Sequence, residues 1–584
     1  MDIVRLGRYF TSCSRIYCSY FHIKHVRFLH TSEIGRAARS RRKVNNNVKD
    51  SKPIVEFRNT LESGPSLQYF VAKRKNRRDK TDIPPSIAVE DKTFCSPYLS
   101  PHQLSGHNRK VYFDVYGCQM NVSDTEIAWS ILKKAGFERT NDILKADVVL
   151  IMTCAIRENA EKKIWAHLDF LRGLVKRKGT KSYNSKIKIG ILGCMAERLK
   201  TKILEEEKCV DLVAGPDSYK DLPLMLAVVE EGNAAVNVML SVDETYADIM
   251  PVRINPESPS AYVSIMRGCD NMCSYCIVPF TRGRERSRPI SSILEEIQDI
   301  IRSKIFLKQI ILLGQKPTKL ADGFKTIYKS KFGGRRFVDL LDKVSEIVPH
   351  IRIRFTSPHP KDFPDEVLHL IRDRNNICNQ LHMPAQSGNS DVLNAMVRGY
   401  TRESYLNLIY KTKSILPEVT ISSDFICGFC GETEEAHQDT LSLIKEVKYN
   451  TLFIYPYSLR EKTGAHRRLH DDVPEDVKNR RTYEADLVYR EVARKLNREK
   501  IGQEQLILIE GKSKKSNDFL AGRNEGFIKV IVPDVEVPNS CKTNNCKLTV
   551  GDYVVVKIID ATSLVLKGIP LYTTSLLEYF VSKS

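Results

Sequence analysis

Three segments of the chain repeat one pattern, an apolar run of strand length that ends on a cysteine. The runs are VYFDVYGC, ADVVLIMTC and KIKIGILGC, and their cysteines are Cys118, Cys154 and Cys194. Amphipathic stretches such as DTEIAWSILKKAGF lie between them, so each interval suits one strand–helix–strand unit, which predicts a parallel sheet. All strands of a parallel sheet end at the same edge, so we expect the three thiols to converge there.

A convergent trio of thiols has two interpretations. Cysteine is among the residue types most often buried, so these could be three ordinary core residues. Each of them ends a strand next to Gly or Thr, however, and this repeated context favours a three-thiolate site for an iron–sulfur cluster that leaves one iron open.

A second trio, Cys269, Cys273 and Cys276, lies within the segment MRGCDNMCSYCIVPFTRGRERSRP. Iron–sulfur clusters need soft thiolate ligands, and electron-transfer ferredoxins supply four of them per cluster. No fourth cysteine follows nearby, so one iron of a four-iron cluster would stay free for reaction. A structural zinc site is the alternative, but zinc prefers four protein ligands in paired Cys-x2-Cys spacing, and no partner pair fits.

Residues 255–490 alternate between strand-like and helical stretches. Six runs, AYVSIMRGC, KQIILLGQ, IRIRFTS, CNQLHMPAQ, VTISSDFICGF and TLFIYPYS, are parted by helices such as SSILEEIQDIIRSK. This pattern predicts a partial barrel of six strand–helix units, (β/α)6. The second cysteine trio follows the first strand, at the barrel end where active sites of such folds lie.

The last part of the chain changes character. Residues 498–572 contain short β-rich runs parted by Gly, Asn and Asp, which predicts a small antiparallel β-barrel. Its basic side chains are candidates for phosphate contacts, namely Lys512, Lys514, Lys515, Arg523 and Lys529. Phe519 and Phe527 are candidate stacking faces for bases, although a charge run is commonly a solvated face and Phe527 could be a core residue.

The formal net charge of +20 is spread unevenly, and no acidic residue occurs from Ile3 to Ser32. Residues 1–50 are therefore predicted to be a mitochondrial presequence that directs the chain to the matrix. A basic arm for nucleic acid has the same composition and is the alternative. Residues 51–109 contain KRKNRRDK and little periodicity, so we expect a disordered basic lead. No apolar run is long enough for a spanning helix, so stable membrane insertion is not expected.

Several motifs resemble those of one enzyme family. YGCQMN, TCAIRENA, GCMAER, MRGCDNMCSYCIVPFTRGRERSRP, LHMPAQSGNSDVLNAMVRGYTRE and SSDFICGFCGETEEAH are similar to motifs of the tRNA methylthiotransferases, a branch of the radical S-adenosylmethionine enzymes. The resemblance implies an α/β protein. It would have a parallel α/β cluster domain at 110–230, a radical-SAM barrel at 255–490 and a TRAM domain, an oligonucleotide-binding-like module, at 498–572.

The resemblance also implies the cofactors. They are two [4Fe-4S] clusters, one on each cysteine trio, and two molecules of S-adenosylmethionine per turnover, of which one donates a methyl group and the other yields a radical. Tyr275 would pack on the adenine of S-adenosylmethionine. The pocket for this cofactor would be lined by Gly314, Gln315, Gln386, Ser387 and Asp424, although each of them alone could be an ordinary turn or packing residue.

The family role implies that a methylthio group is added to carbon 2 of N6-isopentenyladenosine, next to the anticodon of mitochondrial tRNA. No side-chain base can usefully remove the hydrogen on that carbon, so a radical route carried by cofactors is needed. The expected partners are a tRNA anticodon loop, whose bases can be splayed out at small cost, an external electron donor and a sulfur source.

Two alternatives remain. The same chemistry could act on threonylcarbamoyladenosine or on a ribosomal protein. From another class, the chain could be a non-catalytic regulator that binds a protein kinase activator, which would leave two complete cysteine sets without a purpose.

Overall fold

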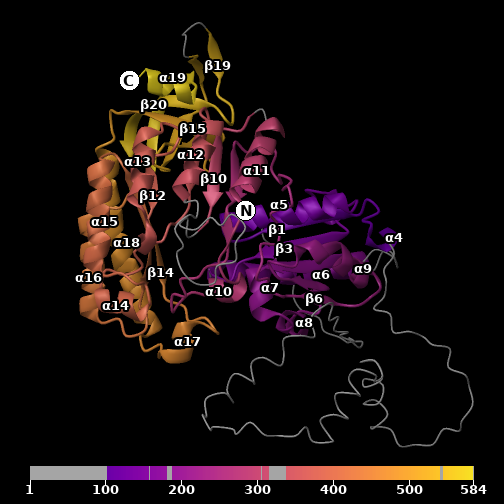
Figure 1. Cartoon of the computed structure of the whole chain (residues 1–584). Helices are drawn as coiled ribbons and strands as arrows, with labels where there is room; N and C mark the ends of the chain where they lie inside the picture. The colour runs from indigo at the N-terminus through magenta and orange to yellow at the C-terminus, as the bar shows by residue number, and fades with distance from the viewer. Residues whose placement is uncertain are drawn as a thin grey trace, which may run out of the picture. The chain divides into compact units, whose positions relative to one another are not determined.

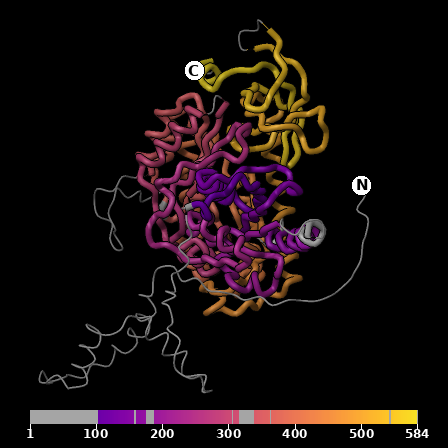
Figure 2. The backbone as a smooth tube through the Cα atoms, turned by 90° about the vertical axis from the view of Figure 1, so that its right-hand side faces the viewer, coloured from indigo at the N-terminus to yellow at the C-terminus, as the bar shows by residue number. Residues whose placement is uncertain are grey.

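The computed structural model of the protein describes residues 101–156, 158–179, 187–303, 306–314, 337–539 and 544–582. The predicted presequence, the basic lead up to residue 100 and Gln315 lie outside these residues. From Pro101 onward the chain belongs to one compact unit. Figure 2 follows it from the N-terminal sheet in indigo through the central barrel to the yellow C-terminal barrel.

The N-terminal domain is built on a parallel sheet of six strands in the order β2-β1-β3-β4-β5-β6. Its strands are β1 (Lys110–Val115), β2 (Glu138–Arg139), β3 (Val148–Thr153), β4 (Lys188–Gly193), β5 (Leu212–Ala214) and β6 (Ala235–Asn237). Its helices are α4 (Pro101–Leu104), α5 (Gln119–Lys134), α6 (Glu158–Gly179), α7 (Cys194–Leu199), α8 (Lys202–Glu206) and α9 (Leu222–Glu230), with short 3-10 turns at Ile143–Lys145 and Tyr219–Asp221.

Helices cover both faces of this sheet (Figure 1). Helices α6, α7 and α8 contribute to the apolar core on one face, and on the other face Trp129 of α5 packs edge-on against Phe113 of β1. Strand β3 is therefore buried along its whole length, as is typical of central parallel strands. The sequence pattern predicted β1, β3 and β4, whereas β2, β5 and β6 are too short to give a recognisable pattern.

The central domain contains the six predicted barrel strands, all parallel to their neighbours. They form two sheets, β7-β10-β11 and β12-β13-β14, joined by a bridge between Ile353 and Ile377. The strands are β7 (Ser260–Ser264), β10 (Gln309–Leu313), β11 (Arg352–Phe355), β12 (Gln380–His382), β13 (Thr420–Cys427) and β14 (Thr451–Pro456). Strands β7 and β14 do not pair with each other among the described residues, so the barrel is partial.

Helices surround these strands and share with them one large apolar core. They are α10 (Val278–Thr281), α11 (Ile290–Ser303), α12 (Phe337–Ile347), α13 (Asp365–Asp373), α14 (Ser390–Ala395), α15 (Arg402–Ile415), α16 (Glu434–Val447), α17 (Gly464–Arg468) and α18 (Glu475–Arg498), with a 3-10 turn at Pro360–Asp362. A short ribbon of β8 (Met266–Arg267) and β9 (Arg286–Ser287) brackets the cysteine loop. No helix of the described residues is both long and apolar enough to cross a membrane.

The C-terminal domain is a closed barrel of five strands in the order β15-β16-β17-β21-β20. Its elements are β15 (Glu504–Lys512), β16 (Phe519–Arg523), β17 (Lys529–Pro533), β18 (Glu536–Pro538), β19 (Asn545–Lys547), β20 (Tyr553–Ala561), β21 (Val565–Thr574) and α19 (Leu576–Val581). The predicted barrel is confirmed, but β17 and β21 run parallel, so it is not wholly antiparallel. An odd number of strands cannot alternate in direction around a closed ring, and one parallel pair is the geometric consequence.

The small barrel docks on the amino-terminal ends of the central strands. Arg354 of β11 donates hydrogen bonds to the backbone oxygens of Asn524 (2.8 Å) and Glu525 (2.6 Å). The ring of Phe527 lies between the guanidinium groups of Arg354 and Arg523, at 4.9 and 4.1 Å from its centroid. Phe527 is thus held at the junction and is not an open stacking face, whereas Phe519 is 41% exposed.

Gly526 lies at the tightest point of this junction. A Cβ atom placed there would lie 2.2 Å from the hydroxyl oxygen of Thr420, so something must move if a side chain is added. We expect Gly526→Ala to destabilise the protein by about 1–3 kcal/mol, as overpacking does. Gly511→Ala is the matched control because its Cβ would meet nothing within 4 Å, and it should change stability by no more than about 0.5 kcal/mol. Urea unfolding checks this, and equal stability of the two variants would contradict the tight junction.

Candidate iron–sulfur sites

The first cysteine trio lies at the carboxyl ends of three adjacent strands. Cys118 follows β1 and is the N-cap residue of α5, Cys154 directly follows β3, and Cys194 follows β4 as the first residue of α7. Strand β3 pairs with β1 on one side and with β4 on the other. The structure therefore brings these three predicted residues together at one sheet edge, where Cys154 and Cys194 are buried and Cys118 is partly exposed.

Two glycines let the chain pass close to this trio. Gly117 has φ +106°, and a Cβ on it would lie 2.7 Å from the Cβ of Cys154. Gly193 has φ +91°, and its Cβ would lie 2.8 Å from the backbone oxygen of Thr153. Residues with side chains rarely adopt such φ values, and a Cβ would have no space at either position. The YGC and LGC motifs therefore need glycine before the cysteine.

The donor set of this trio, three soft sulfur ligands, suits an iron–sulfur cluster. Burial raises the pKa of the Cys194 thiol to about 11, and the neighbouring Cys154 and Cys118 add to the rise, while the charge of Arg282 opposes it. Thiolates are the form that binds metal, so cluster binding at this trio would release protons. The Nε of Arg282 donates to Sγ of Cys194 at 3.1 Å, which places a fixed positive charge beside the sulfur. The residues present therefore fit an anionic iron–sulfur cluster.

The second trio lies in the loop between β8 and α10, next to the carboxyl end of β7. Cys269 and Cys273 are buried and Cys276 is half-buried. Burial raises the pKa of the Cys276 thiol to about 12, and Cys273 and Cys269 raise it further, so these three sulfurs also lie within electrostatic range of one another. Gly268 turns the chain into the loop with φ +72°, and a Cβ there would lie 2.0 Å from the backbone oxygen of Arg284.

A buried arginine that sequence reasoning missed contacts this second trio. The Nη1 of Arg398 lies 3.4 Å from Sγ of Cys273 and donates to the hydroxyl of Tyr275 at 3.2 Å. Its Nη2 donates to the backbone oxygen of Pro384, just beyond β12. Arg398 belongs to the motif VRGY, but nothing in that motif indicates that its side chain contacts Cys273.

A network of buried charges joins the first trio to the barrel's cysteine segment across the contact between the domains. Asp124 of α5 is fully buried and binds Arg267 at 2.7 Å and Arg282 at 2.8 Å, and both arginines belong to the barrel's cysteine segment. Arg282 also donates to the side-chain oxygen of Asn121 at 3.0 Å. The guanidinium of Arg267 stacks on Tyr246 with 4.6 Å to the ring centroid. This network holds the edge of the N-terminal sheet against the mouth of the barrel.

Of the described residues predicted to line the S-adenosylmethionine pocket, Gly314, Gln386 and Ser387 follow the ends of β10 and β12, whereas Asp424 lies within β13. Gly314 directly follows β10, and a Cβ there would lie 2.7 Å from Cγ of Met266. Gln386 has φ +71°, and its backbone N–H donates to the backbone oxygen of Asp424 at 2.9 Å. Ser387 is buried, and its hydroxyl lies 3.5 Å from that of Thr440 in α16, away from the strands. The ring of Tyr275 packs against the apolar cluster around Phe429 and Tyr457.

A polar group faces the inside of the barrel; its Asp424 was predicted as a site residue, whereas sequence reasoning missed His382. His382 of β12 lies 2.9 Å from the hydroxyl of Ser422 and 3.0 Å from a carboxylate oxygen of Asp424. Their chain neighbours Leu381 and Ile421 pack into the core under the helices, so the alternation of strand residues turns this group inward. Phe453 pairs in register with Asp424, lies 6.1 Å from His382 between ring centroids and is 44% exposed.

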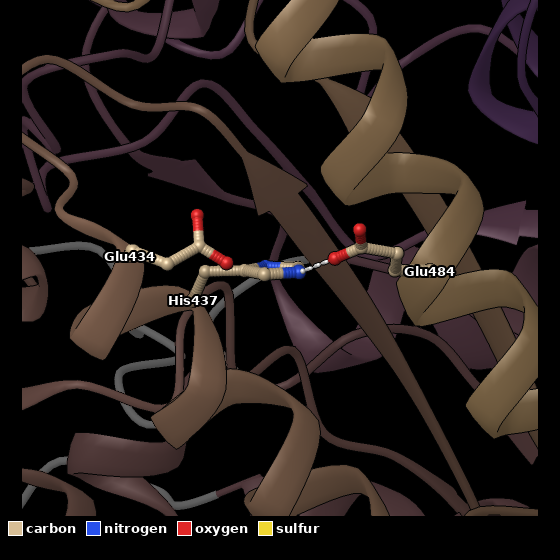
Figure 3. Close-up of side chains that lie close together, drawn as sticks. All are labelled: Glu434, His437 and Glu484. Atoms are coloured by element: carbon tan, nitrogen blue, oxygen red, sulfur yellow. Dashed lines mark hydrogen bonds and ion pairs between the residues drawn. The ribbon is translucent and has the colours of Figure 1, made fainter.

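Glu434, His437 and Glu484 form another cluster of metal-type ligands, and Figure 3 shows His437 reaching Glu484. Arg480 already binds Glu434 at 2.7 Å and Glu484 at 2.8 Å. Its hydrogen bond lowers the pKa of Glu434 to about 2. The three side chains are therefore held in an ion network between α16 and α18.

Three family models match the chain in succession. They are "Uncharacterized protein family UPF0004" at residues 110–215, the "Radical SAM superfamily" at 263–444 and the "TRAM domain" at 498–571. The fold and these matches define a radical S-adenosylmethionine enzyme with a C-terminal TRAM domain, and this class implies S-adenosylmethionine and a four-iron cluster.

Relatives extend the match to nearly the whole chain. The mouse protein named "Mitochondrial tRNA methylthiotransferase CDK5RAP1" is 54% identical over 546 residues, which covers 91% of each chain. The human protein of that name is 52% identical and covers 89% of this chain and 90% of its own. The "tRNA-2-methylthio-N(6)-dimethylallyladenosine synthase" of Chloroherpeton thalassium is 48% identical and covers 79% of this chain and 95% of its own.

The chain belongs to the tRNA methylthiotransferase family, and it is a radical S-adenosylmethionine methylthiotransferase. A solved structure of the cobalamin-dependent radical enzyme OxsB gives a TM-score of 0.41 at 12% identity, covering 65% of this chain and 56% of that one. That similarity is too low to add to the assignment, which rests on the sequence relatives.

One buried acid next to the first trio predicts a pH dependence. Burial raises the pKa of Glu197 in α7 to about 7, against the opposing effect of Lys200 at 3.2 Å. The folded protein therefore holds this proton more tightly than the unfolded chain, so its stabilising effect is present at acidic pH and is lost as the pH rises towards 7. Glu197→Gln removes this titrating group. The change that it makes to the free energy of unfolding should therefore be more stabilising at pH 8 than at pH 5, by at most about 3 kcal/mol.

Tryptophan fluorescence during urea unfolding measures this effect, since both tryptophans of the chain, Trp129 and Trp165, lie in the N-terminal domain. Glu205→Gln in the exposed part of α8 is the matched control and should show no such difference. An identical effect of Glu197→Gln at both pH values would contradict the predicted proton uptake.

Proposed function

We propose that the protein is a tRNA-2-methylthio-N6-isopentenyladenosine synthase of mitochondria. It adds a methylthio group to carbon 2 of N6-isopentenyladenosine next to the anticodon. The observation that carries this proposal is the presence of two cysteine trios at facing edges of two domains, tied together by Arg282, which donates from the barrel's cysteine segment to Cys194 of the other trio.

The names of the relatives support the substrate. Bacterial relatives at 45–48% identity are named for synthesis of 2-methylthio-N6-dimethylallyladenosine, and dimethylallyl is the isopentenyl group of the proposed substrate. The inside of the barrel agrees with an apolar substituent, because the half-exposed ring of Phe453 offers contact to a hydrocarbon. A charged threonylcarbamoyl group would gain nothing from that ring.

Two clusters would be held by the two trios. Cys269, Cys273 and Cys276 would bind the cluster that the radical S-adenosylmethionine class implies, and Cys118, Cys154 and Cys194 would bind a second [4Fe-4S] cluster. When bound, the clusters and two molecules of S-adenosylmethionine per turnover supply the radical and methyl-transfer chemistry that an unactivated aromatic carbon requires.

The side chains of the protein hold and shield these groups. Arg398 and Arg282 each place a buried positive charge beside one sulfur, which offsets the negative charge of thiolate ligands in a region of low dielectric. Burial of four of the six thiols keeps water from the metal sites. At the opposite end of the barrel, Arg354 and the segment around Gly526 hold the TRAM domain against the strand starts.

The S-adenosylmethionine pocket is proposed to involve Tyr275, Gly314, Gln315, Gln386, Ser387 and Asp424. Close packing at Gly314 and the positive φ of Gln386 would let backbone groups approach the cofactor. The hydroxyl of Ser387 is directed to Thr440, so its part in the pocket would be to orient the turn. Asp424 is held by His382 and faces the barrel interior.

A tRNA anticodon loop is the proposed partner. The TRAM domain exposes Lys512, Lys514 and Lys515, and the whole chain has a formal net charge of +20, both of which favour binding of a polyanion. The base next to the anticodon is unpaired, so it can enter a pocket at a small unstacking cost. Arg523 takes a different part from the one predicted, because it binds Glu510 and stacks on Phe527.

The proposal also includes the compartment in which the protein works and the sources of its electrons and sulfur. The names of the mouse, rat and human relatives and the acid-free stretch from Ile3 to Ser32 support a place in the mitochondrial matrix. Reduction of the clusters needs an external electron donor, and each methylthio group needs a sulfur source.

Iron and sulfide analysis tests the cluster content. The anaerobically reconstituted chain should hold two [4Fe-4S] clusters, about eight iron atoms and about eight sulfides. Cys118→Ala and Cys273→Ala should each keep one cluster, about half of the iron. Cys209→Ala is the control because Cys209 packs in the core of the N-terminal domain, and it should keep both clusters. A wild-type chain with one cluster would contradict the transfer mechanism.

Mass spectrometry of tRNA tests the substrate. Cells that lack the protein should lose 2-methylthio-N6-isopentenyladenosine from mitochondrial tRNA and accumulate N6-isopentenyladenosine. The wild-type gene should restore the modification, and Cys118→Ala and Cys273→Ala should not. Loss of the threonylcarbamoyl analogue would assign the other substrate, and unchanged tRNA would favour a non-catalytic regulator that binds a protein kinase activator.

A further inference from the structure

Each cysteine trio has one sulfur in contact with a buried guanidinium group. Arg398 contacts Cys273 at 3.4 Å and comes from the same barrel as that trio. Arg282 contacts Cys194 at 3.1 Å, but Arg282 belongs to the barrel's cysteine segment and Cys194 belongs to the N-terminal domain. The contact between Arg282 and Cys194 therefore crosses the domain boundary. Through it, the segment that carries the second trio touches a sulfur of the first trio.

The surroundings of Arg282 are those of a built anion site. The side chain is 8% exposed, and its remaining partners are Asn121 at 3.0 Å and Asp124 at 2.8 Å. Its Nη1 is buried and has no hydrogen-bond partner among the described residues. A buried donor without a partner costs free energy, so it indicates a group that is present in the working protein.

Arg282 shares its acidic partner with a second arginine. Asp124 carries one negative charge and is shared between Arg267 and Arg282. The other acid of this network, Glu244, lies 3.8 Å from Arg267 and does not reach Arg282. Among the described residues Asp124 is the acid that contacts Arg282, so an anionic cluster on Cys194 would add a second negative group next to the same guanidinium.

We propose that Arg282 is a positioning residue that sets the reduction potential of the cluster held by Cys118, Cys154 and Cys194. This inference rests on the proposed second cluster. Reduction adds one electron and one negative charge to the cluster. A fixed positive charge and an N–H donor to a ligand sulfur stabilise the reduced form more than the oxidised form and raise the potential.

Substitution of Asp124 should shift the reduction potential in the opposite direction from substitution of Arg282. Its carboxylate lies beside Arg282 and partly cancels the positive charge that the cluster experiences. Asp124→Asn should therefore raise the potential, whereas Arg282→Gln should lower it. If Arg282 served only to hold the domains together, both substitutions would loosen the same contact and would move the potential in the same direction.

The experiment uses the full chain with Cys269→Ala, Cys273→Ala and Cys276→Ala, so that only the first trio can hold a cluster. The potential of its electron paramagnetic resonance signal is titrated with dithionite as the reductant. Arg282→Gln should lower the ratio of reduced to oxidised cluster at a fixed potential about tenfold, a shift of about 59 mV for one electron. Arg282→Lys, which keeps the charge, should shift it less, and Asp124→Asn should shift it upward.

Arg398→Gln is the matched control, since Arg398 contacts the other trio, and it should leave this potential unchanged. An unchanged potential in Arg282→Gln, or equal directions for Arg282→Gln and Asp124→Asn, would overturn the inference. If Arg282→Gln fails to bind a cluster, the direction of Asp124→Asn and the size of the Arg282→Lys shift decide. A parent chain without any iron–sulfur signal would instead overturn the second cluster itself, and with it this role.

Discussion

The buried ion network around Asp124 is the interaction on which the arrangement of the two cysteine trios depends. Asp124 is fully buried and would be unstable there without Arg267 and Arg282, because desolvation of an unpaired charge costs several kcal/mol. A docking of the domains that separated Asp124 from Arg267 and Arg282 would leave these charges buried without partners. The network thus selects one relation between the sheet edge and the barrel mouth.

Each end of the central barrel has a separate task. At the carboxyl ends of its strands lie the thiols of the second trio, in a loop that begins with the tight turn at Gly268, and Arg282 of the same segment contacts Cys194 of the N-terminal domain. At the amino-terminal ends, Arg354 and Gly526 lock the small barrel in place. A module that carries exposed lysines is thereby fixed to the barrel through hydrogen bonds from Arg354 to main-chain oxygens and through the half-buried ring of Phe527. An RNA held by that module would meet a rigid catalytic domain, so binding and chemistry would share one frame.

The sequence predicted those features of the fold that follow from the order of apolar runs, helices and cysteines along the chain. The convergence of Cys118, Cys154 and Cys194 follows from strand ends in a parallel sheet, and the six barrel strands follow from alternation of apolar runs and helices. The contact between Arg282 and Cys194 was missed because it joins two domains and leaves no periodic trace in either of them. Phe527 was a candidate for base stacking because it lies in a basic module, with a core position as the alternative. Its contact with Arg354 could not be foreseen because Arg354 belongs to another domain. Likewise, nothing near Ser387 in the sequence indicates that its hydroxyl faces α16.

The central claim is that two clusters lie close together at one interface, and their magnetic interaction tests it most directly. Electron paramagnetic resonance of the fully reduced wild-type chain can be compared with the sum of the spectra of two variants that each hold one cluster, Cys118→Ala and Cys273→Ala. The account predicts broadening or splitting in the wild-type spectrum that the sum does not reproduce. A wild-type spectrum equal to that sum, with both clusters present and reduced, would contradict it.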